Sequence, residues 1–233
     1  MQKKAIVIHS GGMDSSLCLA LALKEFGPAQ TVSLSFSYQQ RHEVELNQAK
    51  KICRDWGVDH AVISIESLKK VTASALMNRT IEIEKQEGLP PNTMVIGRNG
   101  LMAHLAGMYA YDLGAECLYM GVMELEGANS GYRDCSRKYM DLHETLLRID
   151  LDRPLFHIRT PLIRMTKKET MELAHELGLL SYLLEETITC YEGIPFWGCK
   201  RCPACFLRNQ GIKEFTDENP HFKLPLPYLS RGF

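Results

Sequence analysis

Residues 5–26 of the 233-residue chain read AIVIHSGGMDSSLCLALALKEF, and they contain the first strand, loop and helix of the predicted fold. Residues 5–9 form a short apolar run that predicts a buried strand, and residues 14–26 carry apolar side chains at helical spacing. Between the two, Gly11 and Gly12 permit positive φ and let backbone N–H groups approach an anion. A strand, a glycine loop and a helix N-terminus in this order are typical of a phosphate-binding site.

The same alternation continues along the chain. Further strands are expected at residues 31–36, 60–65, 117–121 and 155–159, and further helices at residues 43–56, 98–113 and 167–177. The pattern predicts an α/β fold, with a Rossmann-like parallel five-stranded sheet and helices on both faces. We assign residues 1–180 to this nucleotide-binding domain and residues 181–233 to a small C-terminal metal-binding segment, whose end after residue 219 is expected to be irregular.

Two polar stretches interrupt the alternation. Residues 77–97 are acidic and contain prolines, and long loops of this kind in α/β domains often cover an active site. Residues 127–134 form a second polar loop after a predicted strand. Since ligands of open parallel sheets bind beyond the carboxyl ends of the strands, both loops are expected beside the substrate.

The overall composition is that of a globular protein. Apolar residues make up 45% of the chain and charged residues 24%, with a formal net charge of -1 and a pI near 6.7. This charge provides no electrostatic basis for direct nucleic-acid binding. The N-terminus lacks the pattern of a signal peptide and no stretch has membrane-spanning length, so we expect a cytoplasmic protein without membrane contact.

Four of the eight cysteines crowd into sixteen positions. Cys190, Cys199, Cys202 and Cys205 offer four thiolates to one ion, and a tetrahedral Zn²⁺ held by four sulfurs is the simplest arrangement. Such a closed site leaves no position for water, so its role is expected to be structural. An iron–sulfur cluster and a redox role of these cysteines remain alternatives.

The glycine loop has a more specific likeness. SGGxDS directly after the first strand resembles the signature of PP-loop ATP pyrophosphatases, which cleave ATP between its α and β phosphates. Neither a Walker A lysine nor the third glycine of a dinucleotide fingerprint is present. Asp14 is expected to cap the helix or bind Mg²⁺, because its carboxylate would repel a phosphate. The ATP-binding segment is predicted to comprise His9, Ser10, Gly11, Gly12, Met13, Asp14, Ser15, Ser16, Leu17, Cys18 and Leu19.

A second PP-loop feature is TPLIRMTKKE at residues 160–169. Relatives place a lysine six residues after the proline of a Pro-Leu pair and an acidic residue two positions later, and Lys167 and Glu169 match that spacing. The resemblance implies that Lys167 neutralises charge developing on the pyrophosphate leaving group.

Together these motifs resemble one family, the 7-cyano-7-deazaguanine synthase (QueC) family, from residue 5 to about residue 211. The shared motifs are SGGMDSS, SYQQRH at residues 37–42, PNT at 91–93 with GRN at 97–99, SGYRDC at 130–135, ETITCY at 186–191 and the four cysteines. The resemblance implies a ligase that uses ATP and ammonia to convert 7-carboxy-7-deazaguanine to its 7-nitrile, through adenylate and amide intermediates, in queuosine biosynthesis. Small-molecule substrates and a homodimer are expected.

The resemblance also suggests substrate-binding residues. Tyr38, Tyr132 and Asp134 are candidates for stacking on a flat purine-like ring and hydrogen bonding to it. Arg98 and Arg41 are suited to hold a carboxylate or a phosphate, and Asn99 follows Arg98 in the shared motif. Arg98 is therefore predicted to be catalytic along with Asp14 and Lys167.

The chain departs from the family pattern where Ile96 and Arg133 replace prolines. We expect the Arg133 guanidinium to face the site and pair with the acid or with an ATP phosphate.

Three rival functions stay open at this point. One is a transfer-RNA thiolase, which would need an exposed reactive cysteine pair and a basic surface. Another is a PP-loop enzyme that joins the deazapurine acid to a different amine, even a protein N-terminus. The third is a non-catalytic, zinc-stabilised nucleotide sensor.

Overall fold

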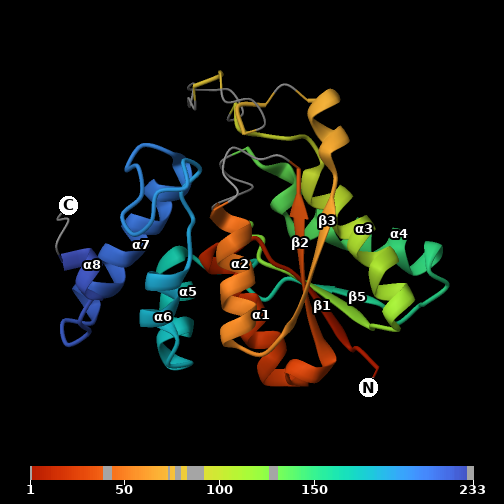
Figure 1. Ribbon diagram of the computed structural model, residues 1–233, viewed down its shortest axis with the longest axis horizontal. Helices are drawn as coiled ribbons and strands as arrows, with labels where there is room; N and C mark the ends of the chain where they lie inside the picture. Colours follow the sequence, from red (N-terminus) through yellow and green to blue (C-terminus); the bar gives the residue numbers. More distant parts are fainter. Residues whose placement is uncertain are drawn as a thin grey trace.

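The computed structural model describes residues 2–38, 44–72, 74–76, 80–82, 92–125 and 131–229. Five parallel strands form one sheet in the order β3-β2-β1-β4-β5 (Figure 1). The strands are β1 (Ala5–Ile8), β2 (Thr31–Ser37), β3 (Asp59–Ser64), β4 (Cys117–Met120) and β5 (His157–Arg159). The α/β class and the five-stranded parallel sheet predicted from the sequence are confirmed.

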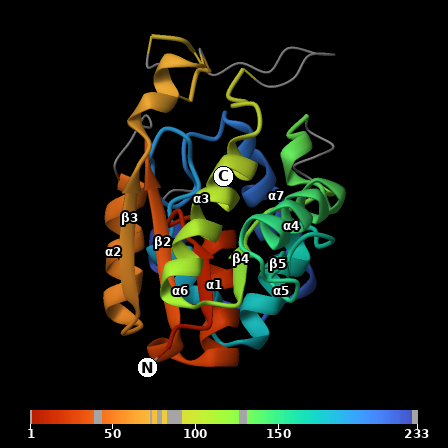
Figure 2. The ribbon, with the colours of Figure 1, turned by 90° about the vertical axis from the view of Figure 1, so that its right-hand side faces the viewer.

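Helices cover both faces of the sheet, as Figures 1 and 2 show from two directions. On one face lie α1 (Met13–Phe26), α2 (Val44–Asp55) and α5 (Lys167–Glu176), and on the other lie α3 (Arg98–Leu113) and α4 (Arg137–Asp150). Alternate strand residues serve the two cores: Ala5 and Val7 pack in the first and Ile6 in the second. Short 3₁₀ turns, η1 (Pro28–Gln30), η2 (Glu66–Lys70) and η4 (Arg133–Cys135), join some of these elements.

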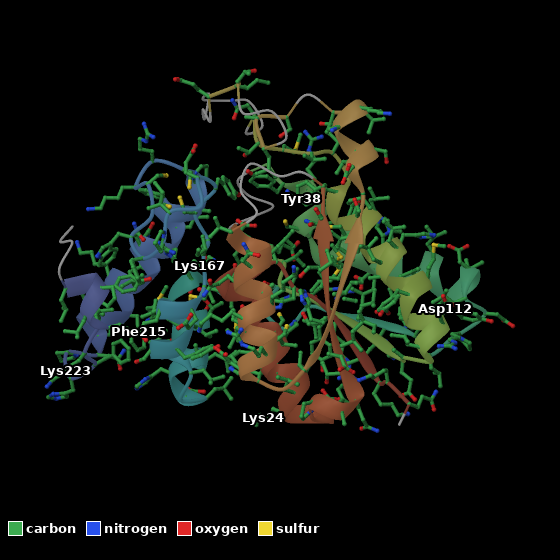
Figure 3. All side chains as sticks on the ribbon, in the orientation of Figure 1. Lys24, Tyr38, Asp112, Lys167, Phe215 and Lys223 are labelled. Atoms are coloured by element: carbon green, nitrogen blue, oxygen red, sulfur yellow. The ribbon has the colours of Figure 1, made fainter. Side chains whose placement is uncertain are left out.

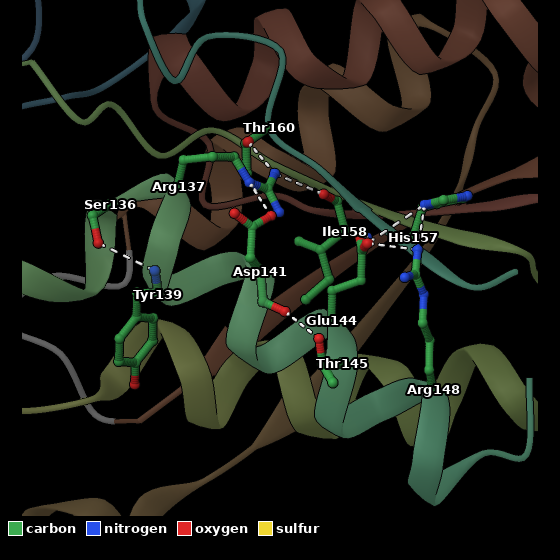
Figure 4. A network of polar contacts seen from close by, with 10 residues as sticks. All are labelled: Ser136, Arg137, Tyr139, Asp141, Glu144, Thr145, Arg148, His157, Ile158 and Thr160. Carbon is green, nitrogen blue, oxygen red and sulfur yellow. Dashed lines mark hydrogen bonds and ion pairs between the residues drawn. The ribbon is translucent and has the colours of Figure 1, made fainter. Parts of the chain in front are cut away.

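Helix α4 adds to the predicted elements and covers the outer edge of β5 (Figure 4). Arg137 Nη1 donates to the carbonyl of Ile158 at 3.0 Å and to Thr160 Oγ1 at 2.7 Å. The Ile158 N–H in turn donates to Glu144 Oε2 at 2.6 Å. Side chains of one helix thus pair with backbone groups that an edge strand would otherwise leave open to another chain.

The C-terminal segment is more regular than the sequence predicts. It contains α6 (Leu180–Glu186), α7 (Pro203–Glu218) and the short α8 (Leu226–Leu229). The expectation of an irregular tail is wrong at α8, because Tyr228 is buried, donates to the Leu184 carbonyl at 3.0 Å and accepts at its own carbonyl from Trp197. The prolines of this segment therefore do not prevent it from packing against the rest of the protein. Within the described residues, no helix has the length and apolar character needed to cross a membrane.

The strand order indicates where a ligand crevice lies in the sheet. The connections from β1 lead outward to β2 and β3, and the chain then returns to β4 on the other side of β1. At such a reversal the loops beyond neighbouring strands diverge and leave a crevice at the carboxyl ends, here of β1 and β4.

Candidate active site

A cavity of about 320 Å³ opens at this crevice. Its floor is formed by the residues that follow β1 and β4, and one side by the ends of β2 and the start of α3. The other side comes from Lys167 at the start of α5 and from the segment around α7. Figure 3 labels Tyr38 and Lys167, which approach the cavity from β2 and α5 respectively. Its volume is that of a small-ligand site.

The glycine loop lies against two other backbones. Gly11 has φ 84°, and a Cβ there would collide with the carbonyl oxygen of Glu45 in the first turn of α2. At the end of β4, a Cβ on Gly121 would come within 2.9 Å of the Ser15 nitrogen. Both positions therefore require glycine. Gly12 is the N-cap of α1, so the free N–H groups of the first helical turn face the cavity.

Hydroxyl groups and a neutral histidine hold the loop in place. Ser15 Oγ accepts from the Ser10 N–H at 3.1 Å and donates to the Gly12 carbonyl at 3.0 Å. His9 lies between Ser33 and Ser16, 3.0 Å from each hydroxyl. Burial, with a smaller contribution from nearby His60, lowers the pKa of His9 to about 3, so the imidazole is neutral. A neutral ring can donate to one serine and accept from the other.

Asp14 and Lys167 form an ion pair across the cleft. Lys167 Nζ lies 2.5 Å from Asp14 Oδ2, and the two side chains are 10% and 23% exposed. Lys167 is the first residue of α5, whose Thr166–Glu169 capping box fixes the start of the helix. The second carboxylate oxygen, Asp14 Oδ1, is buried without a hydrogen-bond partner. An oxygen left in this state fits a cation or a donor supplied by a ligand.

A second cationic group lies toward β2. Arg98, at the start of α3, is 3.5 Å from the Tyr38 hydroxyl through Nη1, and its guanidinium lies 6.0 Å from the Tyr38 ring centre. Glu45 also lines the cavity, and burial raises the pKa of its carboxyl to about 8 even though Arg98 acts in the opposite direction. A carboxyl in this state can hold a proton near neutral pH. The sequence provides no signal for Glu45, because only the packing of α2 on the loop places it here.

Asp134 holds the start of α3. It is buried, and its Oδ2 accepts from the Asn99 N–H at 3.0 Å. Asn99 Nδ2 points back toward the Asp134 carbonyl at 3.5 Å and the Cys135 sulfur at 3.4 Å. Asn99 and Cys135 line the cavity and Asp134 does not. Asp134 is therefore positioned to orient Arg98 and Asn99 and not to contact a ring in the cavity.

Aromatic side chains line the upper part of the cleft. The Tyr132 hydroxyl is 2.5 Å from Thr93 Oγ1. Burial is the main cause of the raised pKa of Tyr191, and a hydrogen bond with Tyr132 raises this pKa further. Tyr38, Tyr132 and Tyr191 all line the cavity. Tyr191 was not among the predicted substrate residues, although it directly follows the metal ligand Cys190.

Several predicted site residues lie elsewhere. Leu17, Cys18 and Leu19 are core residues of α1 with no exposed surface, and they do not line the cavity. Arg41 lies outside the described residues, as do parts of both polar loops. Arg133 is exposed on η4 and is absent from the cavity lining, which contradicts the expectation that it faces the site. The 3₁₀ turn directs Asp134 inward and Arg133 outward. Ile96 is likewise exposed.

The four C-terminal cysteines come together as predicted. The sulfurs of Cys190, Cys199, Cys202 and Cys205 all lie within 4.8 Å of one another. Backbone N–H groups point at them: Cys199 N donates to Cys190 Sγ at 3.4 Å, and Cys202 N to Cys199 Sγ at 3.3 Å. The cluster can hold one metal ion, and its soft sulfur ligands suit zinc or an iron–sulfur cluster.

The cysteine cluster adjoins the candidate active-site cleft. Tyr191 follows one ligand, and Pro203, Ala204 and Leu207 on α7 line the cavity next to the ligands Cys202 and Cys205. The segment that a metal would hold thus forms one wall of the cleft.

Known proteins with similar sequences are found over nearly the whole chain. Residues 4–216 match the family described as queuosine biosynthesis protein QueC. A curated 7-cyano-7-deazaguanine synthase from Bacillus subtilis (strain 168) is 41% identical over 214 residues, which cover 92% of this chain and 95% of the relative.

Solved structures are similar at lower identity. The NH3-dependent NAD synthetase from Campylobacter jejuni subsp. jejuni NCTC 11168 has a TM-score of 0.49 at 18% identity, covering 78% of this chain and 67% of that one. The NMN synthetase from Francisella tularensis has a TM-score of 0.49 at 16% identity, covering 97% and 90%.

Proposed function

The chain belongs to the QueC family of queuosine biosynthesis proteins, and from this premise we propose that it is a ligase that makes 7-cyano-7-deazaguanine from 7-carboxy-7-deazaguanine, ammonia and ATP. The family resemblance seen in the sequence motifs is confirmed by the match. The single structural observation that best supports the reaction is the Asp14–Lys167 pair at the N-terminus of α1, inside the crevice of the parallel sheet.

The ATP phosphates are assigned to the start of α1. The first-turn N–H groups and the Ser10 and Ser15 hydroxyls supply donors there, and the helix dipole adds to the attraction of an anion. Lys167 supplies the cation for the charge that develops on pyrophosphate, exchanging Asp14 for a phosphate oxygen. Asp14 Oδ1, buried and unpartnered, is the oxygen assigned to Mg²⁺, which would neutralise phosphate charge.

The deazapurine acid is assigned to the side of the cleft near β2 and α3. We assign Arg98 to the carboxylate and Tyr38, Tyr132 and Tyr191 to the flat ring, because all four residues line the cavity. Asn99 supplies an amide at the same wall. Asp134 acts through Asn99 by fixing the start of α3. This arrangement directs the acid toward the ATP phosphates, which is the orientation that adenylation needs.

The proposed chemistry proceeds in two activations. A carboxylate oxygen attacks the α-phosphorus of ATP, pyrophosphate leaves, and the acid becomes an acyl adenylate. Ammonia attacks the acyl carbon, AMP leaves, a proton is lost, and the amide forms. In the second activation the amide oxygen attacks the α-phosphorus of another ATP and pyrophosphate leaves. Loss of AMP and two protons from this adenylated amide then yields the nitrile.

The four cysteines are assigned to one structural Zn²⁺. A closed four-sulfur site has no position for substrate, and the segment that it holds forms a wall of the cleft. The division between a nucleotide-binding domain at residues 1–180 and a metal-binding segment at 181–233 remains our proposal; it falls at the start of α6.

The proposed assembly is a homodimer through α3 and α4. Apolar side chains lie exposed at helical spacing on the outer side of α4, where Leu142, Leu146 and Ile149 form one stripe. Met108 and Tyr111 extend the apolar surface on α3, which packs beside α4. An exposed apolar surface of this kind is suited to a second copy of the chain. Absence of direct nucleic-acid contact and a cytoplasmic location remain predictions from the sequence.

The experiment that tests the function is mass spectrometry of products. Protein is incubated with 7-carboxy-7-deazaguanine, ATP, Mg²⁺ and ammonium, and the nitrile is the expected product, with the amide as intermediate. Replacing ammonium by other amines separates this function from an enzyme that joins the acid to a different amine. Pyrophosphate release without any product from the acid would remove the substrate assignment, and no pyrophosphate release at all would favour the nucleotide sensor.

A further inference from the structure

Arg208 is a fully buried cation beside the cysteine cluster. Its side chain is 2% exposed and it is the largest fully buried residue among those described. It lies on α7 three positions after Cys205, so the two residues share a face of the helix. Long side chains on a helix lean toward its N-terminus, which directs the guanidinium toward the turn that carries Cys205.

The guanidinium is poorly satisfied by the protein itself. Nη2 donates to Asn209 Oδ1 over a long 3.4 Å, while Nε and Nη1 are buried without a hydrogen-bond partner. Within the described ranges, no carboxylate forms an ion pair with Arg208. A buried charge without a counter-charge is unfavourable, so the arrangement calls for a negative partner.

Gly198 shows what adjoins the guanidinium. Gly198 has a φ of 65°. A Cβ at this position would collide with Cys205 Sγ and would lie 3.2 Å from Cys190 Cβ and 3.4 Å from Arg208 Nη2. Two metal ligands and the guanidinium therefore surround one point. The chain keeps a glycine at this point, because the Cys205 sulfur occupies the space that a Cβ would fill.

The charge of the loaded cluster supplies the missing partner. Four thiolates around one divalent ion carry a net charge of about -2, because binding requires each cysteine to lose its proton. A guanidinium is permanently charged and offers its N–H donors in a planar fork. Donors aimed at metal ligands orient them and tune their basicity.

We propose that Arg208 is the buried counter-charge of the metal site, donating N–H groups toward the Cys190 and Cys205 thiolates when the ion is bound. This inference rests on the metal site proposed above and adds a positioning residue that is not itself a ligand. Without metal, Arg208 is an uncompensated cation and destabilises the segment; with metal, it stabilises the same segment.

The test compares Arg208→Met with wild type in metal-loaded and metal-free protein. Zn²⁺ affinity is measured by competition with a chromogenic chelator, and we expect Arg208→Met to weaken it roughly 10- to 100-fold. Arg208→Lys, which keeps the charge and loses the fork, should fall between the two. The matched control is Arg201→Met, an exposed cation between Cys199 and Cys202, and it should retain wild-type affinity.

A second readout separates this role from mere packing. Thermal unfolding of chelator-treated protein should show Arg208→Met no less stable than wild type, whereas the loaded variant should be less stable. In Co²⁺-substituted protein, loss of N–H donors to sulfur should move the thiolate-to-metal charge-transfer band to longer wavelength.

Three results would overturn the proposal: wild-type metal affinity in folded Arg208→Met, an equal loss of stability with and without metal, or an unmoved charge-transfer band. Should Arg208→Met fail to fold, the same affinity and spectrum are measured on Arg208→Lys, and unchanged values refute the role. Wild-type protein that binds no Zn²⁺ or Co²⁺ would refute the metal site, and Arg208 with it.

Discussion

Replacing Lys167 by methionine removes a charge from the cleft while keeping nearly all of the side-chain volume. Lys167 Nζ is 2.5 Å from Asp14 Oδ2 at the N-terminus of α1. If Lys167 stabilises charge on the leaving pyrophosphate, its loss removes one electrostatic contact from the transition state. Removal of such a contact costs about 2.7–4 kcal/mol, or roughly 100- to 1000-fold in kcat.

The same change has a separate cost in stability. Breaking a buried ion pair costs about 3–5 kcal/mol and an exposed one at most about 1 kcal/mol. The side chains are 10% and 23% exposed, which puts this pair between those limits, at about 2 kcal/mol. For a chain of this size that corresponds to a decrease in Tm of roughly 4–8 °C.

The assay is pyrophosphate release at saturating ATP, measured beside thermal unfolding of the same samples. Lys168→Met is the matched control, because Lys168 is the next residue of α5 and its ion pairs with Glu172 and Glu218 lie at the surface. The control should keep its kcat and lose little stability.

A double-mutant cycle with Asp14→Asn then separates the two effects. The stability terms of Asp14 and Lys167 should couple, since the side chains are in direct contact. A folded Lys167→Met protein with wild-type kcat would refute the assignment of this lysine to the chemistry, whatever happens to Tm.

Four further outcomes are expected. Gly121→Ala should raise the KM for ATP, because its Cβ would lie 2.9 Å from the Ser15 nitrogen; an unchanged KM would mean that the loop shifts freely. The pKa of His9 is about 3 in the folded protein and near 6.5 in the unfolded chain. The contribution of His9 to the free energy of unfolding is therefore complete above pH 6.5 and is lost as the pH falls toward 3. Urea unfolding should show a loss of about 2 kcal/mol at pH 5 that the His9→Gln variant lacks. Cys202→Ser should lower both bound Zn²⁺ and Tm, with elemental analysis as the measurement, and iron with a visible absorption band would favour a cluster instead. Ile149→Glu should produce a monomer by light scattering, and an unchanged assembly would place the interface elsewhere.

The fold class was accessible from the sequence because it depends on short-range patterns. Apolar runs and helical spacing located all five strands and four of the eight α-helices of the described residues, α1, α2, α3 and α5, within a few residues. The glycine loop was equally clear, since Gly11 takes a positive φ of 84°, whereas Gly12 takes an ordinary extended φ of -81°. Helices α4, α6, α7 and α8 were missed. The side chains of α4, for example, matter through contacts with β5 that no local pattern encodes.

The residues of the site divide in the same way. Asp14, Lys167 and the four cysteines were identified from motifs whose spacing is itself the signal. The outward position of Arg133 and the capping role of Asp134 depend on how η4 meets α3. If η4 were rotated by one residue, Arg133 would point inward and Asp134 outward. The sequence alone therefore could not assign the orientation of these two side chains.

The family, the glycine loop after β1, the four clustered cysteines and the five strands could be predicted from the sequence, because each of these is carried by residues close together in the chain. Only the tertiary structure decided that Glu45 and Tyr191 line the cleft, that Asp14 Oδ1 is left without a partner, and that Arg208 is buried beside the cysteines. These properties arise where separate elements pack together. Burial and the loss of water then set the charge and hydrogen bonding of each group.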